Sequence, residues 1–448
     1  MRFAVATLGC KVNQYDSAMI EARMQAAGYE LTQFDEPADV YVVNTCTVTD
    51  RADSESLRLA RRARRLNPSA RVIATGCLAQ ATPEKLARAG EIDAVVGLGR
   101  LDEIVRAARG EGSGRVVVDN LRKHRAVIEL APVSLSGQTR AFLKVQEGCD
   151  QFCTFCIVPF SRGSSRSVEP RRIVAALDDL HRRGFKEVVL TGVHLGGYGR
   201  DLTPAVTVDD LLEMVAERSP IGRVRISSLD PEELTDRAIS TVTESKKFCP
   251  HFHLPLQSGV DAILSRMRRR YDTAWYRALL DRILEAMPEA SIGTDLIVGF
   301  PGESGEEFER GFDFVASLPL TYLHVFPYST RSGTTAAKYQ GKVEGREIRR
   351  RSARLRELSR QRQERFAERF RGQTLRVLLE DRARAGLLAG YSRNYLRVEA
   401  HGGDWLRNHE VEIHAVDRCG AVLVGGVVSG RGKPGGQSAE IASPAIAP

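Results

Sequence analysis

The sequence predicts an α/β protein in three parts: an N-terminal doubly wound parallel-sheet domain, a central partial (β/α)6 barrel and a C-terminal small β-barrel. Three observations predict this class. Short apolar runs alternate with amphipathic stretches over the first 110 or so residues, and the alternation resumes on a larger scale from 142 to about 330. After 372, short β-prone runs are split by glycine. Strands that alternate with helices are typical of parallel sheets.

The first domain is expected over residues 1–115. Its strands are predicted at 2–7, 40–45, 71–75 and 94–96, and its helices at 17–27, 54–66, 83–89 and 102–109. Because a helical stretch lies between successive apolar strands, the strands are expected to run parallel. A Gly/Ser break at 110–114 and a polar stretch at 134–139 predict a linker.

A second domain is expected over residues 135–368. Six strands are predicted there, at 142–146, 187–193, 224–229, 252–256, 292–300 and 322–328. The helices between them are predicted at 170–183, 208–218, 231–244, 273–286 and 305–318. Six such units are too few for an eight-stranded barrel, so an open, partial barrel is predicted. Chemistry in such folds collects at the C-terminal ends of the strands.

The C-terminal part follows one long predicted helix, 346–371, which holds eleven Arg and four Glu. Short β-prone runs at 374–379, 396–400, 411–414 and 421–428 then predict a small β-barrel over 369–431. The last residues, 432–448, carry few bulky apolar side chains, and a disordered tail is expected there.

The composition restricts the class of protein further. The 448 residues carry a formal net charge of +8, with 42% apolar and 27% charged residues, which excludes a mostly disordered or fibrous chain. No apolar run approaches the roughly 18 residues that a membrane helix needs. The apolar stretch within the first ten residues is too short for the apolar region of a secretory signal. We therefore expect a cytoplasmic protein with no membrane partner. Eight cysteines in such a chain indicate metal or redox chemistry rather than disulfides.

The sharpest motif is a cysteine triplet, Cys149, Cys153 and Cys156, directly after the first strand of the predicted barrel. Four thiolates would saturate a zinc ion or every iron of a [4Fe–4S] cluster, whereas three leave one iron open. An open iron can bind the amino and carboxylate groups of S-adenosylmethionine, whose sulfonium is then cleaved by one electron to give a carbon radical. The alternatives are a zinc site or buried cysteines.

A second set of cysteines, Cys10, Cys46 and Cys77, lies in the first domain, each directly after a predicted strand and before a helix. The C-terminal ends of neighbouring parallel strands share one edge of a sheet. Loops from that edge can bring the three thiolates to one metal centre, which again keeps one coordination position free. Packing of buried cysteines at strand ends is the alternative, but the repetition at three strand ends favours a second cluster.

Two cysteines remain. Cys249, His251 and His253 alternate along one predicted strand, so they share a face and could ligate a metal. An inward-facing polar strand beside the cofactor pocket is the preferred interpretation. Cys419, next to Gly420, is expected in a turn.

Taken together, these motifs resemble a known family. The triplet is similar to the signature of the radical S-adenosylmethionine superfamily, and with the Cys10/Cys46/Cys77 domain before it the chain resembles the methylthiotransferases. The final β-domain resembles a TRAM domain. Further family-like stretches are 8–13, 191–196, 225–228, 253–259 and 299–303.

Several of these stretches end predicted strands with glycine, which permits close backbone approach, or with neutral polar groups suited to ribose and adenine. The expected cofactor-binding residues are Gly192, Val193, His194, Ser227, Ser228, Gln257, Ser258 and Gly299. The expected metal ligands are Cys10, Cys46, Cys77, Cys149, Cys153 and Cys156. No acid–base pair is expected, since a radical does the work at carbon.

The resemblance implies a shared reaction. One S-adenosylmethionine supplies a methyl group to sulfur, and a second is cleaved at the cluster of the triplet and abstracts hydrogen from an unactivated C–H bond. The cluster at Cys10, Cys46 and Cys77 delivers the methylthio group through its open iron. Two [4Fe–4S] clusters and S-adenosylmethionine are therefore the expected cofactors, with an electron donor protein as a partner and a monomeric chain.

The family has three kinds of substrate: tRNA bearing isopentenyladenosine, tRNA bearing N6-threonylcarbamoyladenosine, and an aspartate of a ribosomal protein. The stretches 157–167 and 191–199 resemble the second branch. We therefore expect conversion of N6-threonylcarbamoyladenosine at position 37, in the anticodon stem-loop of tRNA, to its 2-methylthio derivative. The other two substrates are alternatives, and a non-catalytic RNA-binding protein with structural metal sites is an alternative of another class.

The charge supports a nucleic-acid partner. The Arg-rich helix can neutralise phosphates, with a solvated helix face as the alternative. The β-domain offers side chains suited to stacking and backbone contacts on RNA, with aromatic barrel core as the alternative: Tyr391, Arg393, Asn394, Tyr395, Arg397 and Trp405.

Overall fold

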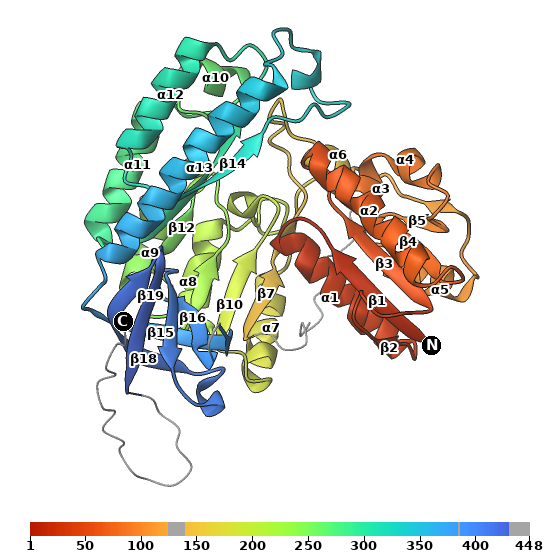
Figure 1. Ribbon diagram of the computed structural model, residues 1–448, viewed down its shortest axis with the longest axis horizontal. Coiled ribbons are helices and arrows are strands. Elements are labelled where there is room, and N and C mark those ends of the chain that lie inside the picture. Colours follow the sequence, from red (N-terminus) through yellow and green to blue (C-terminus); the bar gives the residue numbers. More distant parts are fainter. Residues whose placement is uncertain (124–138, 384–385, 430–448) are drawn as a thin grey trace.

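The computed structural model describes residues 1–123, 139–383 and 386–429, and it confirms the predicted α/β class with its three parts (Figure 1). An N-terminal sheet domain lies beside an open barrel, and a small closed barrel packs below the latter. Most of the predicted linker at 134–139 and the whole tail at 432–448 lie outside the described residues. No helix in the described ranges is both long and apolar enough to cross a membrane.

The N-terminal domain is a six-stranded parallel sheet with the strand order β2-β1-β3-β4-β5-β6. The strands are β1 (Arg2–Thr7), β2 (Glu30–Leu31), β3 (Val40–Thr45), β4 (Arg71–Gly76), β5 (Ala94–Val96) and β6 (Val116–Val117). The helices are α1 (Lys11–Ala26), α2 (Asp50–Leu66), α3 (Cys77–Ala81), α4 (Pro83–Ala87) and α5 (Leu101–Arg109). The four predicted strands are present, and the two edge strands that sequence reasoning missed are two residues long.

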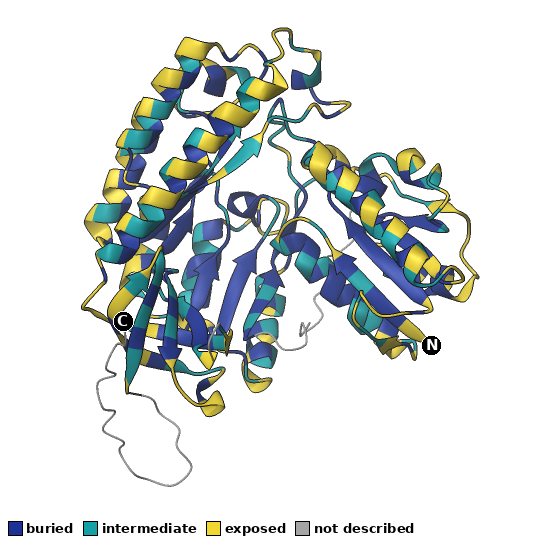
Figure 2. Cartoon of the chain, in the orientation of Figure 1, coloured by how far each residue is buried: buried dark blue, intermediate teal, exposed yellow. Residues whose placement is uncertain are grey.

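Both faces of this sheet are covered, so its strands are apolar throughout. Ile20 of α1 and Ile104 of α5 pack on one face, whereas Ala60 of α2 and Leu86 of α4 pack on the other. The strands appear as a buried layer between exposed helix surfaces (Figure 2). This double cover is what a doubly wound parallel sheet requires.

Helix α1 begins at Lys11, well before the predicted start at 17, and this matters for the site. The Asn13 side chain donates to the carbonyl oxygens of Leu8 (2.6 Å) and Thr45 (3.0 Å). These bonds hold the first turn of α1 against the ends of β1 and β3, directly after Cys10. Sequence periodicity missed this turn because it carries polar residues that are satisfied by other strands.

The central domain is an open, six-stranded parallel barrel made of two three-stranded sheets. They are joined between β11 and β12 by a bridge from Val224 to Phe248 and by a hydrogen bond from Leu229 N–H to the oxygen of His253 (3.1 Å). Its strands are β7 (Arg140–Lys144), β10 (Glu187–Thr191), β11 (Val224–Ile226), β12 (His251–His253), β13 (Ser291–Val298) and β14 (Tyr322–Pro327). The main helices around it are α7 (Pro170–Arg182), α8 (Val208–Arg218), α9 (Asp236–Glu244), α10 (Asp261–Arg266), α11 (Thr273–Ala286) and α12 (Gly305–Ser317).

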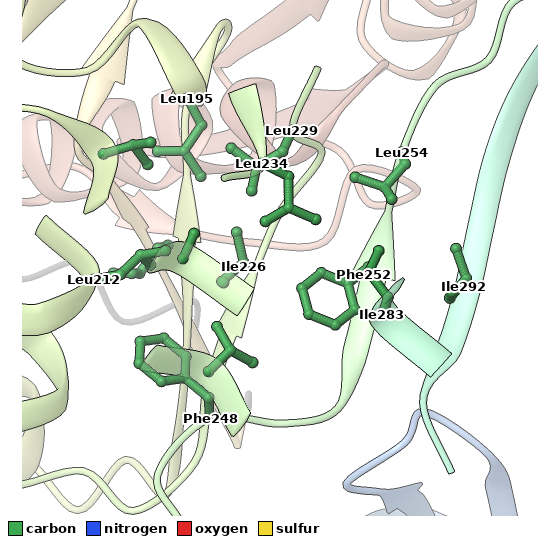
Figure 3. Close-up of a cluster of buried hydrophobic side chains, with 14 of the residues drawn as sticks. Leu195, Leu212, Ile226, Leu229, Leu234, Phe248, Phe252, Leu254, Ile283 and Ile292 are labelled. Atoms are coloured by element: carbon green, nitrogen blue, oxygen red, sulfur yellow. The ribbon is translucent and has the colours of Figure 1, made fainter. Parts of the chain in front are cut away.

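Buried apolar side chains between the strands and this outer helical layer form the largest core. Figure 3 shows part of it, with Phe248, Phe252 and Ile292 from the barrel wall near Leu212 of α8 and Ile283 of α11. The six predicted strands are all present, although β11 and β12 are shorter than expected. The residues after each of them turn away as loops at the end of the barrel where the site lies.

The N-terminal domain closes the open side of the barrel. Helix α1 packs on the edge strand β7, and Arg331, which follows β14 at the other edge, pairs with Asp50 and with Asp53 (3.0 Å to Asp53). The two domains therefore meet along both free edges of the barrel wall, and the Cys10, Cys46 and Cys77 edge of the first sheet lies next to the barrel domain.

The C-terminal part follows helix α13 (Gly345–Glu368) and is a closed five-stranded barrel with the order β15-β16-β17-β19-β18. Its strands are β15 (Thr374–Arg382), β16 (Leu388–Ser392), β17 (Arg397–His401), β18 (Glu410–Cys419) and β19 (Val422–Ser429). Strand β16 was not predicted, because Gly390 interrupts its β pattern. A Cβ atom at that position would overlap the backbone of Leu378, so the close approach of β15 requires glycine there.

Candidate functional site

The cysteine triplet lies in a loop after the short strand β8 (Gln146–Glu147), at the C-terminal end of β7. The backbone folds this loop tightly. Cys149 N–H donates to the oxygen of Gly163 (3.0 Å), and Cys156 N–H donates to the oxygen of Cys153 (3.0 Å). Thr154 anchors the loop on the barrel through a bond from its N–H to the oxygen of Met267 (3.1 Å).

The three thiols of the triplet lie in one largely buried region, where the charges of neighbouring thiols act on Cys149 and Cys156. Burial raises the pKa of Cys149 to about 12 and raises the pKa values of Cys153 and Cys156 as well. Three buried thiols ionise together only beside a cationic centre, so the donor set fits an iron–sulfur cluster held by three cysteines. Arg269 adds a donor to this space, from Nη1 to Sγ of Cys153 (3.4 Å).

The second trio lies where three neighbouring strands of the first sheet end. Cys10 follows β1, Cys46 follows β3 and Cys77 follows β4. The strand order 2-1-3-4-5 reverses between β1 and β3, and such a switch point is where open parallel sheets bind ligands. Cys10 and Cys46 stand on its two sides, and Cys77 stands one strand further along.

Contacts of Asn13 and Gly9 bring these three cysteines together. The Oδ1 atom of Asn13 lies 4.0 Å from Sγ of Cys10 and 3.8 Å from Sγ of Cys77. Gly9 has a φ of 103°, and a Cβ atom there would lie 3.1 Å from Sγ of Cys46. Burial raises the pKa of Cys46 and raises that of Cys77 to about 12, with the neighbouring thiols adding to the rise. This donor set likewise fits a three-cysteine cluster.

Arg162 reaches the second trio from the segment that follows the first. It ends helix α6 (Val158–Arg162), shortly after Cys156, yet its Nε donates to Sγ of Cys77 at 3.3 Å. The same guanidinium pairs with Glu147 (2.6 Å) and Asp16 (2.9 Å). Lys144 completes this buried network through bonds to both carboxylates. The network therefore crosses the domain boundary, contacts the second trio at Cys77 and includes Glu147, two residues before Cys149 of the first trio.

Three of the expected cofactor residues, Gly192, Val193 and His194, form the loop after β10, beside the triplet. His194 N–H donates to Oε1 of Gln146 (2.7 Å), and its Nε2 lies 3.2 Å from Nε2 of Gln151, a residue of the triplet loop. Val193 is half-buried in this loop. A Cβ atom on Gly192 would lie 3.0 Å from Oε1 of Gln146, so the close approach favours glycine.

Ser227 and Ser228 follow β11, at the next strand end. Among the described residues, the buried Ser227 Oγ has no hydrogen-bond partner. Ser228 Oγ lies 2.8 Å from Nδ1 of His253. An unpartnered hydroxyl at a strand end fits a site where a polar ligand accepts or donates its hydrogen bond.

Gln257, Ser258 and Gly299 lie at the ends of the later strands. Gln257 is half-buried in the left-handed region, with a φ of 71°. Ser258 lines a small cavity between the barrel wall and helix α12. Gly299 donates from its N–H to Oε2 of Glu303 (2.7 Å), and a Cβ atom there would collide with Ile348 of α13. The structure therefore places the side-chain positions of Ser258 and Gly299 towards the helical layer, away from Ser227 and Ser228.

The inner face of β12 to β14 is polar. His253 lies 2.9 Å from Asp295, which in turn lies 3.2 Å from His324. Burial opposes the charge on Asp295, but the two histidines overcome it and hold the pKa of this carboxyl well below its usual range. His251 Nε2 lies 2.9 Å from the hydroxyl of Tyr322. Since both histidines of β12 have partners inside the wall, the geometry favours the inward-facing polar strand over a metal site with Cys249.

The residues that sequence reasoning missed are those that act between elements: Asn13, Asp16, Lys144, Arg162, Asp230 and Arg269. Arg269 pairs with Asp230 and reaches Cys153 from the segment after α10. Asn13 and Arg162 stand in family-like stretches, which is the one signal in the sequence that could have found them. Spacing could not, because decisive partners are distant in the chain: Asp16 lies 128 residues from Lys144, and Asp230 lies 39 residues from Arg269.

The structure places four of the expected RNA-contacting residues of the β-domain at its junction with the central barrel: Tyr391, Arg393, Asn394 and Tyr395. Tyr391 stacks on Tyr395 at 4.9 Å, and Arg225 of the barrel lies over the ring of Tyr395. Arg393 pairs with Glu410 and donates to the oxygen of Gly222, and Asn394 donates to the oxygen of Glu289. These side chains join the β-domain to the central barrel because their aromatic and cationic groups meet its lower rim. Of the expected set, Trp405 is exposed and Arg397 half-buried.

The Arg-rich helix α13 is divided between structural and free side chains. Arg351 pairs with Glu303 (2.9 Å), Arg354 with Glu309 (2.5 Å), and Arg362 donates to the oxygen of Leu320 (3.2 Å). Within the described part of the chain, four exposed arginines of α13 have no such partner: Arg346, Arg349, Arg356 and Arg365. Only this subset remains available for phosphates.

Comparisons with known proteins fit this geometry. Residues 2–97 match the uncharacterized protein family UPF0004, and residues 143–315 match the radical SAM superfamily. The chain is 38% identical to the threonylcarbamoyladenosine tRNA methylthiotransferase MtaB of Bacillus subtilis, over 89% of this chain and 90% of that protein. The MtaB protein of Aquifex aeolicus is also 38% identical, over 90% and 97%.

A relative whose name gives another substrate, and a solved structure, add context. The tRNA-2-methylthio-N(6)-dimethylallyladenosine synthase of Clostridium novyi is 33% identical, over 85% of both chains. Among solved structures, the radical S-adenosylmethionine methyltransferase TsrM of Kitasatospora setae is similar with a TM-score of 0.53 and 16% identity, over 73% of this chain and 74% of that one. At that identity the likeness shows the fold alone.

Proposed function

The chain belongs to the radical S-adenosylmethionine methylthiotransferase family, and from this membership we propose that it converts N6-threonylcarbamoyladenosine at position 37 of tRNA to the 2-methylthio derivative. The observation that carries the proposal is the pair of three-cysteine sites, of which Arg162 contacts the second from the segment that follows the first. The MtaB relatives, which cover most of this chain at 33 to 38% identity, support the choice of substrate.

Membership of the family implies S-adenosylmethionine and one [4Fe–4S] cluster. Cys149, Cys153 and Cys156 would hold that cluster, and a second cluster belongs to Cys10, Cys46 and Cys77. The proposed contacts of S-adenosylmethionine are the strand-end residues already described: Gly192, Val193, His194, Ser227, Ser228, Gln257, Ser258 and Gly299. For Ser258 and Gly299 such a contact would have to come from the backbone, since their side-chain positions face the helices.

When bound, these groups supply a carbon-centred radical and a sulfur carrier, which is the chemistry that the cofactors themselves perform. The protein's part is to bind, orient and exclude water. Arg269 donates to Cys153 and is held in turn by Asp230. Arg162 donates to Cys77, with Glu147 and Asp16 fixing its plane. Hydrogen bonds to a sulfur ligand tune the potential of a cluster, so each of the two arginines sets the environment of one trio.

The proposed partners are the anticodon stem-loop of a tRNA and an electron donor protein, and the proposed active unit is a monomer in the cytoplasm. The exposed arginines of α13 and the exposed Trp405 offer phosphate and stacking contacts. Tyr391, Arg393, Asn394 and Tyr395 join the β-domain to the barrel and so position this surface.

The 33% identity to a dimethylallyladenosine synthase makes isopentenyladenosine-37 the second candidate substrate, and a ribosomal protein aspartate is the third. Mass spectrometry of tRNA nucleosides separates them in a strain that lacks the gene. Loss of 2-methylthio-N6-threonylcarbamoyladenosine, restored by the wild-type gene and not by the Cys46→Ala gene, supports the proposal. Persistence of that nucleoside, or loss of the isopentenyl form in its place, rejects it.

A further inference from the structure

A cavity of about 420 Å³ lies at the lower end of the open barrel, where all three parts of the chain meet. Helix α1 contributes Lys11 and Gln14, the barrel wall contributes Arg140, Arg225 and His251, and the β-domain contributes Tyr395. Lys11 directly follows Cys10, so the cavity adjoins the second cysteine trio. No step described above uses this space.

Two of the cations that line the cavity are already neutralised. Arg140 pairs with Glu380 (2.6 Å), and Arg225 pairs with the buried Glu187 (2.8 Å) while donating to the oxygens of Ser392 and Arg393 (both 2.7 Å). A further carboxylate at the rim, that of Asp381, is 80% exposed and faces Arg407 at 3.4 Å.

Lys11 is different, because its ammonium group has neither an ion-pair nor a hydrogen-bond partner among the residues that the structure describes. His251 uses Nε2 towards Tyr322, and its Nδ1 has no partner in the described part of the chain but is closed off from solvent. An unpartnered ammonium group that lines a cavity indicates an anionic ligand.

The required ligand carries an anionic group for the ammonium. Burial and the nearby cations hold the pKa of His251 well below its usual range, so this ring is neutral and adds no second charge to the cavity. An apolar substituent would leave the Lys11 charge desolvated and unpaired, which opposes its binding.

We propose that this cavity receives the N6 substituent of the substrate base, with Lys11 binding the threonyl carboxylate. This rests on the proposed function and deepens it, since it names the residue that selects threonylcarbamoyladenosine over isopentenyladenosine. The selection acts through binding. No covalent step takes place in the cavity.

The test measures binding of matched anticodon stem-loop RNAs to the anaerobically prepared holoprotein, in the presence of S-adenosylmethionine. The RNAs differ only at position 37, which carries threonylcarbamoyladenosine, its carboxyl methyl ester, or isopentenyladenosine. The wild-type chain is expected to bind the free acid about tenfold or more tightly than the ester, as for a charge-assisted bond. Lys11→Gln should bring the ratio close to one, whereas Lys11→Arg should retain most of it.

The exposed Lys186 provides the matched control, since Lys186→Gln removes the same charge at a residue that does not line the cavity and should leave the ratio unchanged. Because the two RNAs have the same phosphates, a general loss of phosphate contacts weakens both affinities and leaves their ratio unchanged. Iron content and Tm are measured on each variant, because Lys11 neighbours Cys10. Should Lys11→Gln lose iron, the comparison of acid and ester on the wild-type chain still decides.

Equal binding of acid and ester by the wild-type chain, or an undiminished ratio in Lys11→Gln, would overturn the inference. A weaker affinity of Lys11→Gln for S-adenosylmethionine with an unchanged RNA ratio would also overturn it, by assigning the cavity to the methionine carboxylate. If the wild-type chain modifies threonylcarbamoyladenosine but binds the free acid and the methyl ester equally well, only this inference fails. If it modifies isopentenyladenosine instead, the proposed function fails too.

Discussion

Arg162 of the central domain donates from Nε to Sγ of Cys77 in the N-terminal domain, at 3.3 Å, with its guanidinium almost wholly buried. The residue stands shortly after Cys156, so one short segment supplies a ligand to the first trio and a hydrogen bond to the second. The two proposed cluster sites are thereby held in a set relation across the domain boundary.

Replacement of Arg162 by methionine is expected to destabilise the protein strongly. The variant would leave the buried carboxylates of Glu147 and Asp16 with Lys144 alone, and breaking a buried ion pair in this way costs about 3 to 5 kcal/mol. Thermal unfolding checks this. Arg171→Met, at a side chain that is 85% exposed, should leave Tm nearly unchanged. An Arg162→Met chain as stable as the wild type would contradict the role of the network.

The two trios should separate in function. Cys153→Ala is expected to abolish reductive cleavage of S-adenosylmethionine, because it removes a ligand of the proposed radical-generating cluster. Cys46→Ala should retain that cleavage, followed as 5′-deoxyadenosine, and prevent sulfur insertion. Methylthio product from Cys46→Ala would disprove the assignment of the N-terminal site.

Gly9→Ala should impair the second trio. It adds backbone strain at a φ of 103° and places a methyl group 3.1 Å from Sγ of Cys46. Gly28 is the matched control, because it has a φ of 88° but open space around its Cβ position, so Gly28→Ala adds strain alone. Iron analysis of anaerobic protein should show loss only in Gly9→Ala. Equal iron in both variants would rule out this steric account.

The contact between the barrel and the β-domain should weaken in acid. Burial opposes ionisation of Glu410, but hydrogen bonds and charges of Arg393 and Arg223, with Arg376 also paired to it, lower its pKa to about 2. Since the folded pKa lies below the ordinary value of 4.5, the stabilisation is complete above about pH 4.5 and is lost as the pH falls towards 2.

The Tm difference between wild type and Glu410→Gln should therefore be large at pH 7 and shrink near pH 3. Glu357→Gln, at an exposed carboxylate paired to Arg360, should show little difference at either pH, because solvent screens that pair. A Glu410→Gln difference that stays constant with pH would argue against an ionised Glu410 at this contact.

The strand ends show best what could be predicted from the sequence alone. Cys10, Cys46 and Cys77 follow apolar runs, so a parallel sheet brings them to one edge whatever the details of packing, and the structure places them at that edge. The six barrel strands and the long helix α13 were predictable for the same reason, since their patterns are local.

What depended on packing between domains was not predictable. Tyr391 and Tyr395 form a pattern suited to RNA, but they stack on each other beneath Arg140 and Arg225 because the β-domain closes the lower end of the barrel. Strand β16 was missed because Gly390 makes room for β15. The partners of Arg162 lie up to 149 residues away in the sequence, and sequence spacing does not predict contacts over that separation.

The most direct test of the account is iron analysis and electron paramagnetic resonance of anaerobically prepared wild-type chain beside a variant with Cys10, Cys46 and Cys77 all changed to alanine. The account predicts that the variant keeps half of the wild-type iron and still cleaves S-adenosylmethionine, without forming methylthio product. A variant with the full wild-type iron content, or a wild-type chain that holds zinc at these cysteines, would contradict it.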